Sequence, residues 1–87
     1  MKMIILILKD SDSDAVTQAL TSADYRVTRV ASTGGFLRSG VATLLLGVDD
    51  DRVDSAIGLI REKVSKAAPT EKRATLFVVP VERFEQV

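Results

Sequence analysis

The sequence predicts a single α+β domain over residues 1–87, a four-stranded antiparallel sheet with two helices on one face, in the ferredoxin-like order β-α-β-β-α-β. Two observations support this prediction. Apolar runs typical of strands alternate with segments whose apolar residues recur at helical spacing, in two successive strand-helix-strand halves. The chain is also long enough for only one modest core.

The first half contains a strand, a helix and a second strand. Residues 3–8 form a continuous apolar run, which is typical of a central strand buried on both faces. Ser11, Asp12 and Ser13 offer N-caps for the following helix, because their short side chains can accept hydrogen bonds from unpaired backbone N–H groups. Residues 25–32 predict a more polar strand. The apolar stripe of the helix consists of Val16, Ala19, Leu20 and Ala23.

The second half repeats this pattern. Residues 41–48 predict an apolar third strand, and Asp49, Asp50 and Asp51 are predicted to cap the next helix, where carboxylates suit the positive end of the helix dipole. Residues 73–79 predict the fourth strand, which Pro80 ends, and a short tail follows. The stripe of the second helix consists of Val53, Ile57, Ile60 and Val64.

The apolar side chains on the face of the sheet without helices are expected to be buried by another surface. The first, third and fourth strands carry apolar residues at successive positions, and therefore on both faces. A chain of this length has no further element to place there. We therefore expect the open face to be buried against other copies of the same chain.

Composition excludes several classes of protein. Lys and Arg number 12 and Asp and Glu number 12, so the net charge is zero, which argues against a general binder of nucleic acids or membrane surfaces. The absence of cysteine and histidine excludes disulfides, thiol or imidazole metal ligands and a Ser-His-Asp triad. The apolar start is too short to span a bilayer, and Lys9 and Asp10 follow it where a secretory signal would have a cleavage site. We expect a cytoplasmic protein without membrane insertion.

The glycine-rich stretch 33–40 is the most informative segment. Consecutive Gly34 and Gly35 let backbone N–H groups converge into an anion-binding nest, and Arg38 adds a planar donor fork for phosphate. Phe36 adds a flat apolar surface for a base. This combination indicates a ligand with a phosphate and a base. The alternative is a hairpin loop whose glycines serve positive φ and whose Phe36 packs at an interface.

The acidic residues do not indicate catalysis. Asp10, Asp12 and Asp14 alternate as at the start of an EF-hand loop, but Thr21 stands where the bidentate Glu is required, so capping is the better interpretation. The aspartates at 49–51 are interpreted in the same way. Since no carboxylate pair can be placed in a cleft, the sequence does not predict an enzyme, a metal site or a cofactor.

Two linked motifs carry a family resemblance. Thr-Gly-Gly-Phe-Leu-Arg-x-Gly at 33–40 is followed by Gly-Val-x-Asp-Asp-Arg-Val-Asp at 47–54. Together with the segments 1–8, 10–13, 25–28 and 75–81, these motifs make nearly the whole chain resemble the PII-like cyclic di-AMP receptor family, within the nitrogen regulatory PII-like superfamily.

The resemblance implies a signal-transduction protein that forms a homotrimer. Each subunit interface would hold one pocket for a nucleotide, with cyclic di-AMP as the first candidate. Arg26 and Thr28, two apart on one strand face, would contact the ligand, and Gly47 would let it approach the chain closely. From the loop motif or the resemblance, the predicted ligand-binding residues are Arg26, Thr28, Gly34, Gly35, Phe36, Leu37, Arg38 and Gly47.

Departures from the family pattern keep other hypotheses open. Asp24 and Val41 stand where family members commonly have asparagine, and Ser65–Lys72 is a short turn where the family has a longer, ligand-responsive loop. A different nucleotide, or a ligand-independent trimeric scaffold for an unknown protein partner, are the alternatives. Phe77 matches an apolar family position and is interpreted first as a core residue.

Overall fold

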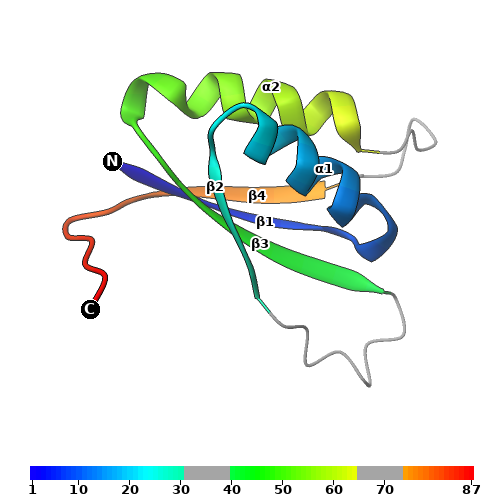
Figure 1. The fold of residues 1–87 in the computed structure, drawn as a ribbon, viewed down its shortest axis with the longest axis horizontal. Helices are drawn as coiled ribbons and strands as arrows, with labels where there is room; N and C mark the ends of the chain where they lie inside the picture. The colour runs from blue at the N-terminus through cyan, green and yellow to red at the C-terminus, as the bar shows by residue number, and fades with distance from the viewer. Residues whose placement is uncertain (31–39, 65–73) are drawn as a thin grey trace.

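The computed structural model describes residues 1–30, 40–64 and 74–87, and its elements follow the predicted order (Figure 1). The predicted ferredoxin-like α+β fold is therefore confirmed, with one additional short 3-10 helix before the second α-helix. The elements are β1 (Lys2–Lys9), α1 (Asp10–Ser22), β2 (Arg26–Val30), β3 (Val41–Val48), η1 (Asp50–Arg52), α2 (Val53–Lys63) and β4 (Ala74–Pro80).

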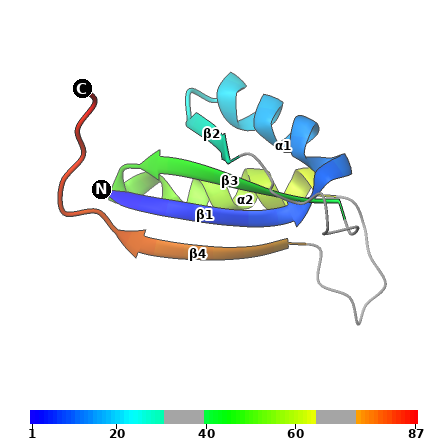
Figure 2. The same ribbon diagram turned by 90° about the horizontal axis from the view of Figure 1, so that it is seen from below.

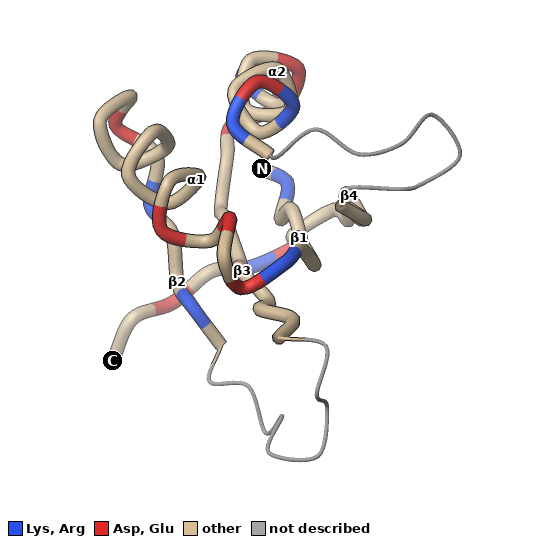
Figure 3. Tube along the Cα trace, turned by 90° about the vertical axis from the view of Figure 1, so that its right-hand side faces the viewer, with Lys and Arg blue, Asp and Glu red and all other residues tan. Residues whose placement is uncertain are grey.

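The four strands form one antiparallel sheet in the order β2-β3-β1-β4. Strand β1 is central, as its apolar sequence predicted, while β2 and β4 are the edges. The predicted burial of β1 on both faces is wrong for the single chain, because only its residues on the helix side are buried. Both helices lie on the same face, and the view from below shows the other face without a helix (Figure 2). Figure 3 shows the helices on one side of the strands and the C-terminal tail leaving on the other.

The core lies between the helices and the sheet. Strands β1 and β3 alternate in their burial, and the register places Ile4 opposite Leu46 and Leu6 opposite Leu44, all with no exposed surface. Full burial of each such side chain stabilises the fold by about 1.5–3 kcal/mol. The helices add buried residues from the predicted stripes and one residue that the stripes omitted: Val16, Leu20, Ile60, Val64 and Ala56.

The open face is apolar but only half covered within one chain. The odd-numbered residues of β1 face it, and the apolar ones among them, Met3, Ile5 and Ile7, are half-buried. On the neighbouring edge strand, Phe77 lies opposite Ile5 and is 53% exposed. The interpretation of Phe77 as a core residue is therefore wrong for the single chain, because the face onto which it projects has no helix.

The helix starts differ from the predicted caps. Helix α1 begins at Asp10 with no side-chain cap, so Ser11 and Asp12 lie inside its first turn. The backbone N–H of Asp10 instead donates to the carbonyl of Gly40, which satisfies a group that a cap would otherwise serve. The hydroxyl of Ser13 donates to the Asp10 carbonyl at 2.9 Å rather than accepting from the backbone.

The aspartates at 49–51 also do not cap α2 through their side chains. Asp49 precedes η1, and the backbone N–H of Arg52 closes this turn by donating to the Asp49 carbonyl at 2.9 Å. Arg52 is the residue before α2, again without a side-chain cap. The acidic residues still lie near the positive end of the helix dipole, as predicted.

The strand limits differ slightly from the predictions. Strand β2 begins at Arg26 rather than Tyr25, and β4 ends at Pro80 instead of before it. Pro80 is tolerated because an edge strand does not need every N–H. Within the described ranges no helix is both long and apolar enough to cross a membrane.

Candidate functional site

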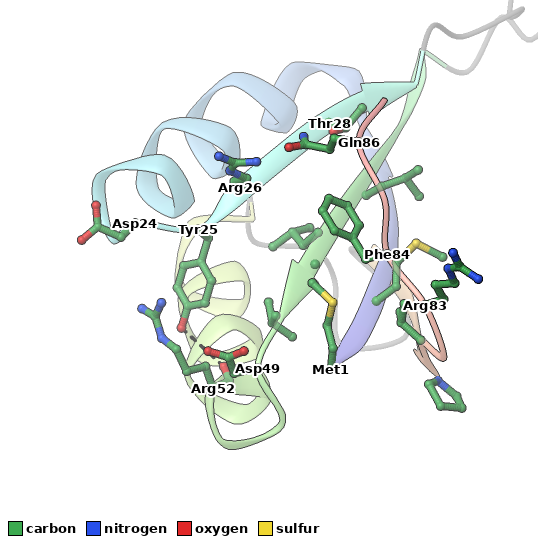
Figure 4. Close-up of a pocket in the computed structure, with 17 residues that line it drawn as sticks. Met1, Asp24, Tyr25, Arg26, Thr28, Asp49, Arg52, Arg83, Phe84 and Gln86 are labelled. Carbon is green, nitrogen blue, oxygen red and sulfur yellow. Dashed lines mark hydrogen bonds between the residues drawn. The ribbon is translucent and has the colours of Figure 1, made fainter.

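A pocket of about 720 Å³ opens on the helix-free face, where β2 begins and β3 ends (Figure 4). Its volume is in the range of small-molecule sites, roughly 300–1,000 Å³. The chain ends complete the wall, since residues of the C-terminal tail lie opposite β2. The lining residues that the argument below uses are Met1, Asp24, Tyr25, Arg26, Thr28, Gly47, Arg52, Phe84 and Gln86.

The structure brings three predicted ligand-binding residues together. Arg26 lies opposite Gly47 in the β2–β3 register, and Thr28 lies two residues further along the same face. All three line the pocket. The prediction that Arg26 and Thr28 share a face is confirmed, because that inference needs only the two-residue period of a strand.

Arg26 differs from the other arginines around the site. Arg29 donates to Ser13 at 2.6 Å and to Asp14 at 2.8 Å, and Arg83 donates to Glu85 at 3.0 Å. Within residues 1–30, 40–64 and 74–87, Arg26 is exposed and makes neither a hydrogen bond nor an ion pair. Its guanidinium is thus available to an anion.

Gly47 lines the pocket without a side chain that would fill part of it. A Cβ atom at this position would lie 3.1 Å from the terminal methyl group of Met1. Because that end of the Met1 side chain is flexible and lines the pocket, a methyl group at position 47 would displace Met1 there rather than disrupt the strand.

Met1 also ties the tail to the sheet. Its carbonyl accepts a hydrogen bond from the Val81 N–H at 3.1 Å, and its amine pairs with Asp50 at 2.9 Å. This hydrogen-bonded amine lowers the pKa of the exposed Asp50 carboxyl from its usual value. Beyond Val81, Phe84 and Gln86 line the pocket, and Phe84 is 58% exposed.

Asp24, which stands where family members commonly have asparagine, ends helix α1. Its φ of 68° is left-handed, its N–H donates to Thr21 at 3.1 Å, and the N–H of Tyr25 donates to Leu20 at 3.0 Å. This pair of bonds is a Schellman motif, which ends α1 with a left-handed residue. In Figure 4 the Asp24 carboxylate points away from Phe84 and Met1, and so away from the pocket.

Tyr25 and Arg52 form one corner of the wall. The Arg52 guanidinium carbon lies 4.1 Å from the centre of the Tyr25 ring. Arg52 Nη2 donates to the Ala23 carbonyl at 3.0 Å, and the Tyr25 hydroxyl donates to the Arg52 carbonyl at 3.4 Å. This arrangement joins η1 to the turn between α1 and β2.

Sequence reasoning missed both this corner and the tail. The only signals were an aromatic residue, Phe84, in the polar tail and an arginine, Arg52, after the acidic run. Neither residue has a spacing in the sequence that predicts contact with the pocket.

The other predicted ligand-binding residues, Gly34, Gly35, Phe36, Leu37 and Arg38, lie outside the described residues, as does the Ser65–Lys72 turn. Val41 is half-buried on β3 and is absent from the pocket lining. Among the described residues, no group of acidic side chains could hold a metal ion.

A ferredoxin-like domain with a mixed polar and apolar pocket on its open sheet face is suited to small-molecule binding in the manner of PII-like proteins. Comparison with known families agrees. Residues 1–70 match the family model of the cyclic-di-AMP receptor, so the chain belongs to the cyclic-di-AMP receptor family, which is PII-like.

A solved structure extends the likeness to the whole chain. The crystal structure of a functionally unknown protein from Pediococcus pentosaceus ATCC 25745 is 28% identical and superposes with a TM-score of 0.78. The match covers 99% of this chain and 96% of the other. Family membership supports a nucleotide-binding, signalling protein rather than an enzyme.

Proposed function

We propose that this protein is a PII-like signal-transduction protein that binds a nucleotide second messenger, cyclic di-AMP first, at the subunit interfaces of a homotrimer. The observation that carries the proposal is the guanidinium of Arg26, which has no partner among the described residues and lies beside Thr28 and Gly47 in one pocket. The receptor family supports a nucleotide as the ligand.

The pocket offers the groups that a phosphate and a base require. Arg26 can form charge-assisted hydrogen bonds to a phosphate, worth about 1.5–3 kcal/mol each, and the Thr28 hydroxyl can donate another. The exposed ring of Phe84 offers a surface on which a base can stack, for about 1–3 kcal/mol. The loop residues Gly34–Arg38 are proposed to add the backbone nest, a second guanidinium and the Phe36 ring.

The open face supports the proposed self-association, and the family resemblance is the reason for proposing three copies. Its apolar side chains are incompletely covered in one chain, and Phe77 and Val30 are 53% and 41% exposed. Copies that bury this face against one another would also border the pocket, since both lie on the same side of the sheet. The ligand would then contact two subunits.

Calorimetry with cyclic di-AMP, ATP and cyclic AMP tests the binding proposal. We expect micromolar affinity or better for cyclic di-AMP and weaker binding of the other two nucleotides. Absence of heat with all three nucleotides would reject the sensing function.

Replacing Arg26 with alanine is the sharpest single test. Removal of a charge-assisted contact predicts an affinity for cyclic di-AMP about 10–100-fold lower, because each such bond contributes about 1.5–3 kcal/mol. The unfolding free energy should change by less than about 0.5 kcal/mol, since Arg26 is exposed. Arg61→Ala, an exposed arginine on α2, is the matched control and should bind as the wild type does. Equal affinity in the two variants would place the phosphate elsewhere.

The second candidate function is a ligand-independent trimeric scaffold for a protein partner. The exposed apolar face favours it, because burying that face needs copies of the chain but no ligand. A thermal melt separates the two functions. Ligand at 100 times its Kd should stabilise a receptor by about 2.7 kcal/mol, whereas a scaffold should show no shift. A shift with another nucleotide alone would change the ligand and keep the receptor class.

A further inference from the structure

We propose that Arg52 is a positioning residue of the ligand pocket, which acts through Tyr25 to fix the start of β2 and hence the side chain of Arg26. The role of Arg26 in this statement rests on the proposed function. The positioning of β2 by Arg52 is a separate claim, which can be measured without a ligand.

The contacts of Arg52 join two walls of the pocket. Its guanidinium lies over the Tyr25 ring at 4.1 Å, which is a cation–π distance, while Nη2 donates to the Ala23 carbonyl at 3.0 Å. In return the Tyr25 hydroxyl donates to the Arg52 carbonyl at 3.4 Å. One side chain therefore holds both ends of the turn that leads into Arg26, the residue directly after Tyr25.

Strand β2 depends on such anchors. Among the residues that the structure describes, it is an edge strand of five residues that pairs with β3 alone, and four of its five residues are exposed, Val27 being half-buried. At its far end, Arg29 is tied to Ser13 and Asp14 of α1. At its near end, Tyr25 is 5% exposed and is held by Arg52. The two anchors lie on either side of Arg26 and Thr28.

Arg52 lines the pocket at its edge, with its guanidinium away from the side where Phe84 and Met1 lie (Figure 4). In Figure 4 its guanidinium lies on the far side of the Tyr25 ring from Phe84 and Met1. One face of the guanidinium covers the ring, and Nη2 is used by Ala23. These contacts direct Arg52 toward Tyr25 and the turn before β2, which is the route by which we propose that it affects a bound nucleotide.

The test uses Arg52→Met, which keeps most of the aliphatic stem but removes the charge and the donors, and Arg52→Lys, which restores the charge and one donor. Arg61→Met on α2 is the matched control. Amide hydrogen exchange of residues 25–28 measures the order of β2 directly, and calorimetry measures affinity for cyclic di-AMP. Tyr25 is the chain's only tyrosine and there is no tryptophan, so ultraviolet emission also reports this contact.

We expect Arg52→Met to speed exchange at residues 25–28 relative to the rest of the chain, to change the tyrosine emission and to weaken binding about tenfold. Arg52→Lys should recover part of each effect, and Arg61→Met should change none. Unchanged exchange at residues 25–28 in Arg52→Met would overturn the proposal, even if affinity fell, because Arg52 would then act by charge alone. Faster exchange with unaltered affinity would also overturn it.

The two proposals fail in different ways. If the wild-type protein binds no nucleotide, the receptor function is rejected, while the exchange and emission measurements still decide whether Arg52 orders β2. If the wild type binds and Arg52→Met binds equally well, only the positioning role is rejected.

Discussion

The two faces of the sheet carry similar apolar side chains, but these are fully buried on one face and partly exposed on the other. On the helix face, Ile4 and Leu6 of β1 have no exposed surface, whereas Ile5 on the other face is only half-buried. On β4, Phe77 projects from the open face and remains 53% exposed. Because both faces are apolar, the difference lies in what covers them and not in composition.

The two faces of the sheet therefore have different roles, since one forms the core and the other carries the candidate binding site. The helix face is complete in one chain and accounts for its core, with helices, β1 and β3 in mutual contact. The open face carries the pocket with Arg26 and the unburied apolar residues. The apolar surface that one folded chain leaves incompletely buried is therefore the surface available to other copies of the chain and to ligands.

The largest expected effect is the loss of assembly when a charged residue is introduced on the open face. Phe77→Asp should abolish assembly, since it would place a carboxylate where copies bury apolar surface. Val78→Asp is the matched control, because Val78 is 41% exposed in the same strand but projects toward the helix side. Sedimentation should find monomers for the first variant and wild-type mass for the second. The same mass for both variants would remove the distinction between the faces.

A core truncation tests the other face. Leu6→Ala should lower the unfolding free energy by about 3–4 kcal/mol, because Leu6 is fully buried between the helices and the sheet. Urea denaturation at fixed protein concentration measures this loss. Glu62→Ala, exposed on α2, should change stability by less than about 0.5 kcal/mol. A loss below about 1 kcal/mol for Leu6→Ala would mean that this face is not the main core.

Gly47→Ala should separate binding from folding. The new methyl group would displace the end of Met1, which lines the pocket, so we expect affinity for cyclic di-AMP to fall about tenfold, or about 1.4 kcal/mol. Gly58→Ala is the control, since a Cβ at this position in α2 meets no atom within 4 Å. It should leave binding unchanged and stabilise the helix by about 0.5–1 kcal/mol. Normal calorimetric affinity in Gly47→Ala would exclude a close approach of the ligand there.

The smallest effect is expected at Asp24. Asp24→Asn should stabilise the protein by about 0.5 kcal/mol, because it removes a negative charge from the C-terminal end of a helix. Asp54→Asn, in the first turn of α2, should have the opposite sign in the same urea titration. Affinity for cyclic di-AMP should change less than threefold. A tenfold gain in affinity for Asp24→Asn would show that the carboxylate faces the ligand.

The order of elements was predictable because it depends on local periodicity. The apolar runs predicted as β1 and β3 and the segments predicted as helices form these elements in the structure, and Arg26 and Thr28 share a strand face as predicted. The helix caps were not predictable. A carbonyl from Gly40, remote in sequence, serves the Asp10 N–H, and no local pattern encodes such a contact.

The pocket residues that sequence analysis identified are Arg26 and Thr28 of β2 and Gly47 of β3. The corner of the pocket joins Tyr25 to Arg52, and its wall brings Phe84 beside β2, so each contact depends on the packing of the whole chain. The glycine-rich loop that the sequence indicated most strongly lies outside the described residues. Its role stays a prediction.

The edge strand β4 has a consequence for solubility. Residues 74–80 contain no charged side chain, and in the described chain this strand pairs with β1 alone, so one row of backbone donors and acceptors is unprotected. Strands of this kind seed intermolecular β-structure when nothing blocks them. A variant that separates the copies without adding a charge to β4 should therefore make the protein prone to forming fibrils or precipitate. Quaternary structure would then guard against aggregation as well as shape a binding site.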